Sequence, residues 1–459
     1  MSYYKHTTIL SAGNPDGILC DQLKCIRYHE LPGLLDELHR IFSAHSLQAA
    51  ACIGVSVENN ITCLLSILYF LAEGIHFYLL PGDSPVHQGM PAFCDWMLSS
   101  SGVERNPDYN GQAMRARPGG GLIFFSSSGT TGKPKYICYT QQRLLLNAGN
   151  CVKRLGLTQA SRVLVPVPVS HMYGMGVGLL PALLAGASVT LIEKNNIIKL
   201  TEKFRAFQPT ITLVTPAVVR MMSLVKRQPG GVSSLFITAG EKIGREAYQE
   251  FESAQGMLLN LYGCTEMGAI GVSPEEGESR RDGLIRALEG IEVRVAADTQ
   301  QIECRHNAGF ESYVDEWGGP CSDESYSDGW FATRDAGWMD GAYCFKVLGR
   351  TDNCINRSGF LVSLDEVGTL VEDLCPEISR AVVIESGEGI RGELTAICEL
   401  YPGFTIEPEA VKQQLREKMN RHQLPDRFCF IREMPKLPGG KPDRAYLLQH
   451  YQELVKNKL

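Results

Sequence analysis

The stretch that decides the fold reads Leu122-Ile123-Phe124-Phe125-Ser126-Ser127-Ser128-Gly129-Thr130-Thr131-Gly132-Lys133-Pro134-Lys135-Tyr136. Its apolar start and the apolar run from Tyr136 to Thr140 predict two strands, with a hydroxyl-rich glycine loop between them. Gly129 and Gly132 permit positive backbone dihedrals and a close approach of the backbone. The hydroxyls, amides and lysines of the loop can surround a polyanion, so the stretch predicts a phosphate site.

The spacing of this loop differs from that of a Walker loop. Two residues rather than four separate Gly129 from Gly132, and Pro134 follows Lys133 where Ser or Thr is required. An ordinary P-loop ATPase or kinase is therefore disfavoured. A glycine hairpin with surface lysines stays open as an alternative for the loop taken alone.

Length and composition restrict the class of protein. A chain of 459 residues predicts about three lobes at roughly 150 residues per domain. The net charge of −7 argues against a broad nucleic-acid-binding surface, so no nucleic-acid partner is expected. The amino-terminal residues do not resemble a signal peptide, and no apolar run reaches a membrane-spanning length of about 20 residues. These features predict a cytoplasmic protein without a membrane span.

The fifteen cysteines are scattered, without a Cys-x-x-Cys pair or a Cys/His cluster at zinc spacing. We expect reduced thiols, many of them in the core.

Helical and strand-like segments alternate along the first half of the chain. Such alternation predicts a mostly parallel sheet covered by helices on both faces, with ligands beyond the carboxyl ends of the strands. The run from Arg162 to Val169 reads as an edge strand because of Pro166 and Pro168. Short strands from Glu276 to Asp340 predict a β-rich subdomain.

The expected fold class is therefore α/β, with a large multi-lobed amino-terminal domain (1–349) and a small mobile α+β carboxyl-terminal domain (350–459).

Two polar clusters follow predicted strands. Ala239-Gly240-Glu241 is a glycine turn, and Tyr262-Gly263-Cys264-Thr265-Glu266 ends another strand. Tyr262 can stack on a purine, Thr265 can donate to a phosphate oxygen, and Glu266 can bind Mg²⁺ through oxygen. Each cluster alone is equally compatible with an ordinary turn and a solvated side chain.

Taken together, the motifs resemble those of the adenylate-forming superfamily, which includes acyl- and aryl-CoA ligases, peptide-synthetase adenylation domains and luciferases. Six motifs occur in the family's order between about residues 120 and 444. The chain departs from the family pattern where Tyr136 and Arg334 replace glycines, Asn356 replaces a common Lys, and Leu364 replaces a common Pro.

The resemblance implies a nucleotide site built from distant loops. Asp335 would bind the ribose hydroxyls, since a carboxylate is the natural acceptor for a vicinal diol. Arg350 would make a second nucleotide contact, although both residues can equally form a surface ion pair. The full set of implied nucleotide-binding residues is Ser127, Ser128, Gly129, Thr130, Thr131, Gly132, Lys133, Ala239, Gly240, Glu241, Tyr262, Gly263, Thr265, Asp335 and Arg350.

The resemblance also implies catalytic and hinge residues. Lys441, in Gly440-Lys441-Pro442-Asp443-Arg444, would be the catalytic lysine that bridges the substrate carboxylate and the α-phosphate. Glu266 would hold Mg²⁺ beside Thr265, and His171 would shape the acyl pocket. Asp352 would be the hinge, and Gly359 would lie in the loop at the thiol entrance.

The expected reaction joins a small carboxylic acid to a thiol through an acyl-adenylate, with ATP and Mg²⁺. CoA and the phosphopantetheine of an acyl carrier protein both stay open as the thiol. The segment around His171 has no Asp to bind an α-ammonium group, so an aryl or medium-sized apolar acid is expected rather than an α-amino acid. A catalytically degenerate nucleotide sensor is the alternative in another class, and a plain NTPase is a third reading.

Overall fold

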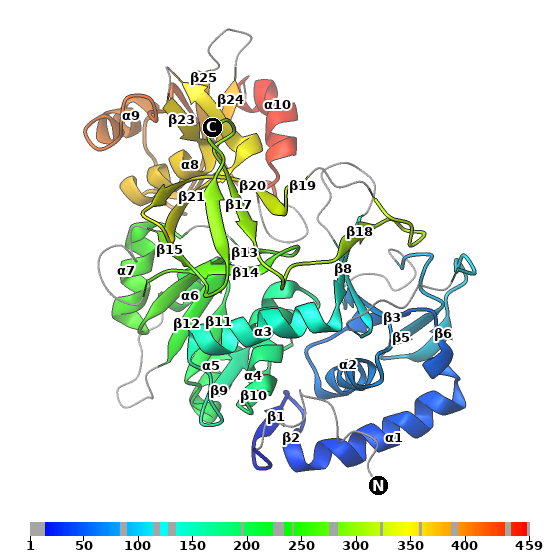
Figure 1. Cartoon of the computed structure of the whole chain (residues 1–459). Coiled ribbons are helices and arrows are strands. Elements are labelled where there is room, and N and C mark those ends of the chain that lie inside the picture. Colours follow the sequence, from blue (N-terminus) through cyan, green and yellow to red (C-terminus); the bar gives the residue numbers. More distant parts are fainter. Residues whose placement is uncertain are drawn as a thin grey trace.

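The computed structural model describes residues 14–82, 90–112, 120–126, 135–193, 197–223, 234–240, 243–274, 283–321, 325–357, 360–386, 393–436 and 442–456. Within these ranges the chain forms two large sheets of 14 and 7 strands, two smaller sheets, and helices that cover them (Figure 1).

The larger sheet is parallel in one half and antiparallel in the other. In the first half, the adjacent strands β1, β10, β9, β11, β12 and β13 are parallel to one another. At the edge of this half, β2 pairs with β1 in the antiparallel direction. From β13 onward every pairing is antiparallel. The strands run in the order β2 (Cys25–Arg27), β1 (Ile18–Cys20), β10 (Ser188–Leu191), β9 (Arg162–Val165), β11 (Ile211–Val214), β12 (Leu235–Ala239), β13 (Leu258–Cys264), β14 (Gly268–Val272), β15 (Leu284–Ala287), β21 (Cys344–Arg350), β20 (Trp330–Asp340), β17 (Gln301–Arg305) and β16 (Glu292–Val295), with β19 (Tyr326–Ser327) also on β20.

The second sheet carries the strands on both sides of the predicted phosphate loop. β7 and β8 pair directly with each other in the antiparallel direction, as expected for a strand, loop and strand. The order is β18 (Ser312–Val314), β8 (Tyr136–Thr140), β7 (Leu122–Ser126), β4 (Phe77–Pro81), β3 (Ile53–Val57), β5 (Trp96–Ser99) and β6 (Gly102–Arg105). Tyr136, which replaces a family glycine, is buried at the start of β8, where its ring packs edge-on against Tyr78 and Phe93.

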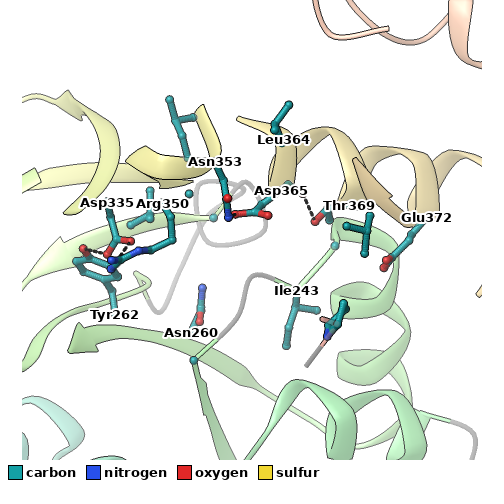
Figure 2. A pocket seen from close by; sticks show the side chains of 18 of the residues that line it. Ile243, Asn260, Tyr262, Asp335, Arg350, Asn353, Leu364, Asp365, Thr369 and Glu372 are labelled. Carbon is teal, nitrogen blue, oxygen red and sulfur yellow. Dashed lines mark hydrogen bonds and ion pairs between the residues drawn. The ribbon is translucent and has the colours of Figure 1, made fainter. Parts of the chain in front are cut away.

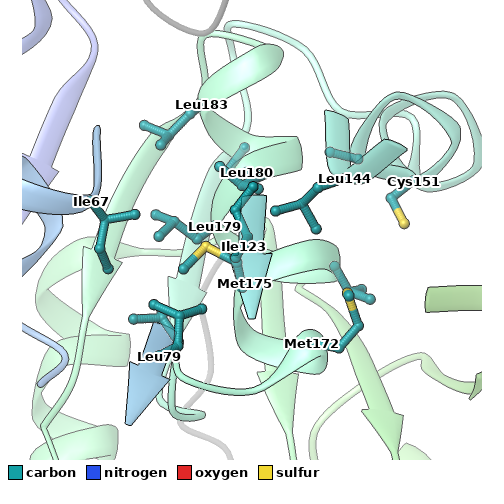
Figure 3. Packing of buried hydrophobic residues seen from close by; sticks show 14 of the residues in the cluster. Ile67, Leu79, Ile123, Leu144, Cys151, Met172, Met175, Leu179, Leu180 and Leu183 are labelled. Carbon is teal, nitrogen blue, oxygen red and sulfur yellow. The ribbon is translucent and has the colours of Figure 1, made fainter. Parts of the chain in front are cut away.

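Helices fill the space between the large sheets and cover their outer faces. A continuous apolar cluster joins α2 and the second sheet to α3 and the helices that follow β9, as Figure 3 shows with Ile67, Leu79, Met175 and Leu179. Burial of such a surface is the main stabilising term of the fold. The helices of this part are α1 (Leu31–Ala44), α2 (Ile61–Glu73), α3 (Gln141–Leu155), the π-helix η3 (Tyr173–Leu179), α4 (Leu180–Leu184), α5 (Ile197–Phe207), α6 (Pro216–Ser223) and α7 (Arg245–Ala254), with short 3₁₀ turns η1 (Tyr28–Glu30) and η2 (Leu47–Ala49).

After β21 the chain passes through the 3₁₀ turn η5 (Thr351–Asn353) and forms a smaller α+β unit at one end of the molecule (Figure 1). This unit has apolar clusters of its own, around Val367, Leu394 and Val411 and around Ile384 and Leu447. Its elements are β22 (Cys354–Arg357), β23 (Phe360–Ser363), α8 (Leu364–Leu374), β24 (Ile378–Ser386), β25 (Glu393–Leu400), α9 (Pro408–Arg416), β26 (Arg427–Ile431) and α10 (Arg444–Lys456). The division between residues 349 and 350, and any motion about it, stay proposals.

The fold class is confirmed as mixed α/β with large sheets, but two expectations need correction. β9 is an interior strand, parallel to β10 on one side and β11 on the other, because it ends at Val165, before the two prolines. The region after Glu276 is rich in strands as expected, and these strands extend the larger sheet.

The second correction concerns the cysteines. Cys20 and Cys25 form a disulfide across the β1–β2 hairpin, where their Cα atoms are 4.1 Å apart. The hairpin holds both residues at directly paired positions, a contact that the scattered spacing did not indicate. Within the described ranges, no helix has the length and apolar character needed to span a membrane.

Candidate active site

The β13, β20 and β21 strands bring together three of the predicted nucleotide-binding side chains. The Tyr262 hydroxyl donates to Asp335 Oδ2 at 2.6 Å and lies 3.0 Å from Thr333 Oγ1. Arg350, directly paired with Asp335 across the β20–β21 ladder, places Nη1 3.7 Å from Asp335 Oδ1 (Figure 2). The sheet thus presents a carboxylate held by a tyrosine on one side and a guanidinium on the other.

Two opposing effects act on the Asp335 carboxyl. Burial raises its pKa above the ordinary value, whereas the hydrogen bond from Tyr262 and the charge of Arg350 lower it. Burial also raises the pKa of the Tyr262 phenol, so this hydroxyl stays protonated and remains a donor. Tyr262 and Asp335 are therefore arranged so that the Asp335 carboxylate oxygens can accept hydrogen bonds from neighbouring hydroxyl groups.

Arg334 retains the backbone conformation that the replaced glycine would have. Its φ of 61° lies in the left-handed region, where a side chain is disfavoured. The side chain is exposed, and its carbonyl oxygen accepts a hydrogen bond of 3.1 Å from the Thr351 hydroxyl. Arg334 therefore holds a left-handed conformation within β20, directly before Asp335, at the cost of local strain.

Gly263 is required by a close approach between β13 and β14. The β13 register shifts between Tyr262 and Gly263, and a Cβ at residue 263 would lie 2.1 Å from the Gly268 carbonyl oxygen. The ladder is therefore irregular at the end of β13, and Gly263 lines the same cavity as Tyr262.

A cavity of about 500 Å³ unites five of the predicted nucleotide-binding residues: Gly240, Tyr262, Gly263, Asp335 and Arg350. Their elements are far apart in the sequence, but they converge beyond the carboxyl ends of the parallel strands, where ligands of open α/β sheets bind. The opposite wall comes from the carboxyl-terminal unit, through Asn353, Leu364, Asp365, Thr369, Glu372 and Arg444 (Figure 2). Ala239, which ends β12, immediately precedes this lining.

A polar network after the predicted hinge covers the cavity. Asn353 donates to Asp365 Oδ2 at 3.1 Å, and Arg444 forms an ion pair with Asp365 Oδ1. Arg444 is the last residue of the motif that contains Lys441 in the sequence, and the network holds Arg444 beside the cavity. Asp352, on η5, is exposed. Leu364, in place of a common proline, is buried at the first turn of α8, which Ser363 caps.

Thr265 and Glu266 lie in the turn that follows β13. The Tyr313 hydroxyl donates to Glu266 Oε1 at 2.7 Å, and the Tyr139 hydroxyl lies 2.8 Å from the Thr265 carbonyl oxygen and 2.7 Å from that of Glu266. Both tyrosines belong to the second sheet. The turn is therefore fastened across the two sheets, next to the strand that leaves the predicted phosphate loop.

A divalent metal fits this arrangement only with the help of a substrate. The described residues contain no group of three or more His, Cys, Asp or Glu side chains that could hold a metal ion by themselves. Glu266 supplies one hard carboxylate, and Mg²⁺ is usually bound by one or two carboxylates together with phosphate oxygens. Glu266 therefore suits a Mg²⁺ ion that arrives with a nucleotide.

His171 is exposed just before η3. The chain bends tightly here, since a Cβ at Gly174 would lie 2.2 Å from the Pro168 carbonyl oxygen. Among the residues that the structure describes, His171 is not part of the lining of the 500 Å³ cavity. Its predicted role at an acyl pocket stays a prediction.

Several predicted site residues lie outside the described ranges. They are Ser127, Ser128, Gly129, Thr130, Thr131, Gly132, Lys133, Glu241, Gly359 and Lys441. Conversely, sequence reasoning missed Tyr139, Tyr313, Asn353 and Asp365. Asn353 directly follows the predicted hinge residue, and the other three stand outside the motifs; only the three-dimensional pairing of the strands and helices places them at the site.

The chain is similar to known enzymes over most of its length. A family model described as "AMP-binding enzyme" matches residues 92–309. The indoleacetate–CoA ligase of Aromatoleum aromaticum is 28% identical over 361 residues, which cover 75% of this chain and 70% of that protein. The anthranilate–CoA ligase of Pseudomonas aeruginosa is 24% identical over 455 residues, covering 96% and 86%.

Solved structures with the same fold include ATP-bound MatB from Rhodopseudomonas palustris, with a TM-score of 0.82 and 19% identity over 98% of this chain and 99% of that one. The o-succinylbenzoate CoA synthetase of Bacillus subtilis, in complex with its acyl-adenylate intermediate, has a TM-score of 0.80 and 18% identity over 96% and 97%. At these identities the likeness concerns the fold.

Proposed function

The chain belongs to the adenylate-forming superfamily, and from this premise we propose that it activates an aryl or medium-sized apolar carboxylic acid with ATP and transfers the acyl group to a thiol. Its enzyme class is that of an acid–CoA ligase, which uses ATP, Mg²⁺ and CoA. The observation that carries the proposal is the single cavity shared by Gly240, Tyr262, Gly263, Asp335 and Arg350.

The first half-reaction must overcome charge repulsion. A carboxylate oxygen attacks the α-phosphorus of ATP, the bond to the β-phosphate oxygen breaks, and acyl-AMP and pyrophosphate result. Negative charge gathers on oxygen in this transition state, and fixed cations and donors stabilise it. In the proposal Lys441 spans the carboxylate and the α-phosphate, while Lys133, the hydroxyls of Thr130 and Thr131, and the Ser127–Gly132 amides hold the outer phosphates.

The adenosine half of the nucleotide has its own contacts. Asp335 accepts from the ribose hydroxyls, with Arg350 beside it, and Tyr262 and the Ala239–Glu241 turn face the adenine. A Mg²⁺ ion held by Glu266 neutralises charge on the phosphates when it is bound, and Thr265 donates to a phosphate oxygen. These roles agree with the placement of Tyr262, Asp335 and Arg350 around one cavity.

In the second half-reaction the thiol attacks the acyl carbon, a thioester forms, and AMP leaves. CoA is the thiol donor that the named relatives support, and a carrier-protein phosphopantetheine is a further candidate. The loop at Gly359 would line the thiol entrance. Lys441 and Gly359 both belong to the unit that follows Asp352, and rotation about this hinge would offer each of them to the adenylate in turn.

The proposed class of acid is supported by the lack of charged residues around His171. The residues from Pro166 to Gly174 contain no carboxylate that could pair with an α-ammonium group, and the following helices η3 and α4 are almost entirely apolar and buried. An acid without a second charge suits such surroundings, because burying an unpaired charge is expensive. His171 would stand at the mouth of this pocket.

One assay tests the proposal. Pyrophosphate exchange into ATP is measured with a panel of aryl, alkyl and α-amino acids, and the best acid is then supplied with CoA or with a holo carrier protein. Exchange that depends on an apolar acid, followed by acyl-CoA formation, is the expected result. Release of ADP would instead indicate an NTPase. The absence of exchange with every acid would favour a nucleotide sensor. The cytoplasmic location of the protein, which this assay does not address, stays a prediction.

A further inference from the structure

Tyr313 links the two large sheets at the predicted metal ligand. It lies on β18, the outermost described strand of the second sheet, and pairs with Ile137 of β8, the strand that leaves the phosphate-loop sequence. Its hydroxyl donates to Glu266 Oε1 at 2.7 Å, on the turn after β13 of the larger sheet. The side chain therefore spans from the phosphate-loop strand to the carboxylate.

The ring that carries this hydroxyl is fixed by its surroundings. Tyr313 is only 9% exposed, and its ring meets Phe310 at a centroid distance of 4.8 Å and an angle of 62°. Lys135, the last lysine of the phosphate-loop sequence, places Nζ 5.6 Å from the centre of the Tyr313 ring. A ring held on several sides keeps its hydroxyl in one place, so the donor faces Glu266 without an entropic cost at the time of binding.

The backbone of the same turn is held separately. The Tyr139 hydroxyl contacts the carbonyl oxygens of Thr265 and Glu266, whereas Tyr313 contacts the Glu266 side chain. Removal of the Tyr313 hydroxyl therefore leaves the backbone anchor intact, and it frees only the rotation of the carboxylate.

We propose that Tyr313 is a positioning residue for Mg²⁺·ATP: it holds one oxygen of the Glu266 carboxylate so that the other faces the metal. The inference rests on the proposed function, in which Glu266 is the metal ligand. Groups that orient a metal ligand are worth roughly 10- to 100-fold in metal affinity or activity when removed. Tyr313 acts through Glu266 and does not touch the reacting atoms.

The test is Tyr313→Phe, which keeps the ring and its packing and removes only the hydroxyl. ATP is titrated into the whole chain by calorimetry, without acid, once with Mg²⁺ and once with EDTA. We expect the gain in ATP affinity on adding Mg²⁺ to fall roughly 10-fold in the variant, while the affinity in EDTA stays as in the wild type. The Mg²⁺ concentration for half-maximal pyrophosphate exchange should rise by the same factor.

Tyr326→Phe is the matched control. This ring stacks on the other side of Phe310, at 5.6 Å, but its hydroxyl faces Met267 Sδ at 3.4 Å. It should bind Mg²⁺·ATP as the wild type does. An equal loss in both tyrosine variants, or an equal loss with and without Mg²⁺, would show a structural role only and would overturn the inference.

A second variant separates the inference from the function on which it rests. Glu266→Gln should abolish the Mg²⁺-dependent gain, and adding Tyr313→Phe to it should cause no further loss, because both changes act on one interaction. A further 10-fold loss in the double variant would overturn the role of Tyr313 alone. If Glu266→Gln retains the full Mg²⁺-dependent gain, the role of Glu266 fails, and that of Tyr313 fails with it.

Discussion

The two walls of the cavity are built in different ways. On one side Tyr262, Asp335 and Arg350 stand on β13, β20 and β21 of one hydrogen-bonded sheet, whose inner face joins the apolar core. On the other side the carboxyl-terminal unit meets the large part through polar contacts, such as the Ser363 hydroxyl with the Leu348 carbonyl oxygen and the Arg245 amide with Asp373. Sheet and core contacts are lost only by unfolding, whereas exposed polar contacts exchange with water at little cost.

The difference indicates a division of labour. Residues on the sheet wall should serve the nucleotide throughout the reaction, while residues on the carboxyl-terminal wall should serve one step and then be replaced. Each of the following predictions tests one side of this comparison.

The largest effect is expected from the predicted catalytic lysine, which belongs by sequence to the carboxyl-terminal unit and lies outside the described residues. Lys441→Ala should lower adenylation by roughly 10²- to 10³-fold, the scale of losing one transition-state donor. Thioester formation from supplied acyl-AMP should survive much better, because that step no longer needs the lysine at the α-phosphate. The two rates are measured separately, by pyrophosphate exchange and by acyl-CoA formation. Equal losses in both would mean that the carboxyl-terminal unit serves both steps, and the comparison would fail.

A residue on the sheet wall, in contrast, should affect both half-reactions. Asp335→Asn should lower the affinity for ATP and the affinity for acyl-AMP by about the same factor, roughly 10- to 100-fold. The reason is that hydrogen bonds to a charged group contribute about 1.5–3 kcal/mol. Both half-reactions should therefore suffer through KM. The ion pair of Arg350 with the carboxylate is lost as well, so the melting temperature of the variant is the control for folding.

A smaller effect is expected from the contact between the two units. Asp373 Oδ2 accepts from the Arg245 amide, at 3.1 Å, at the start of α7. Asp373→Ala removes this cap, a contribution of about 1 kcal/mol, and should shift the ratio of the two half-reaction rates roughly fivefold. Asp373→Asn, which keeps a capping oxygen, is the matched control. A change in both rates by one common factor would contradict a role in arranging the units.

The smallest effect concerns strain in the sheet wall. Arg334→Gly should relieve the left-handed backbone and raise stability by at most about 1 kcal/mol, seen as a melting temperature higher by one or two degrees. Arg334→Ala removes the same side chain but keeps the strain, so it should melt below the glycine variant. ATP binding should change little in either. A loss of ATP affinity in Arg334→Gly would mean that the arginine side chain contributes to the site.

Much of this architecture could be predicted from local pattern. The alternation of apolar runs predicted the strands and helices on both sides of the phosphate loop, a strand-end motif pointed to Tyr262, and the family resemblance pointed to Asp335. Periodicity is a local property, however, and it does not say which strands become neighbours. The prolines after Val165 suggested an edge, yet β9 ends before them and lies inside the sheet.

Tertiary pairing explains what the sequence did not predict. Tyr313 sits on a strand of three residues without a motif, and it reaches Glu266 only because β18 joins β8 beside the turn after β13. The disulfide of Cys20 and Cys25 likewise depends on a hairpin that the first 50 residues did not suggest. Arg334 replaced a glycine, and the surrounding ladder still imposed the glycine conformation.

The position of Arg350 in the chain has a consequence for the release of AMP. Arg350 is the last residue of β21, it pairs with Asp335, and two positions later the chain reaches Asp352. The residue that would bind the ribose is thus separated by only one residue from the predicted hinge residue Asp352. We expect AMP to dissociate more slowly while the carboxyl-terminal unit stays in the orientation proposed for thioester formation. Product release, rather than a chemical step, would then limit the rate of turnover.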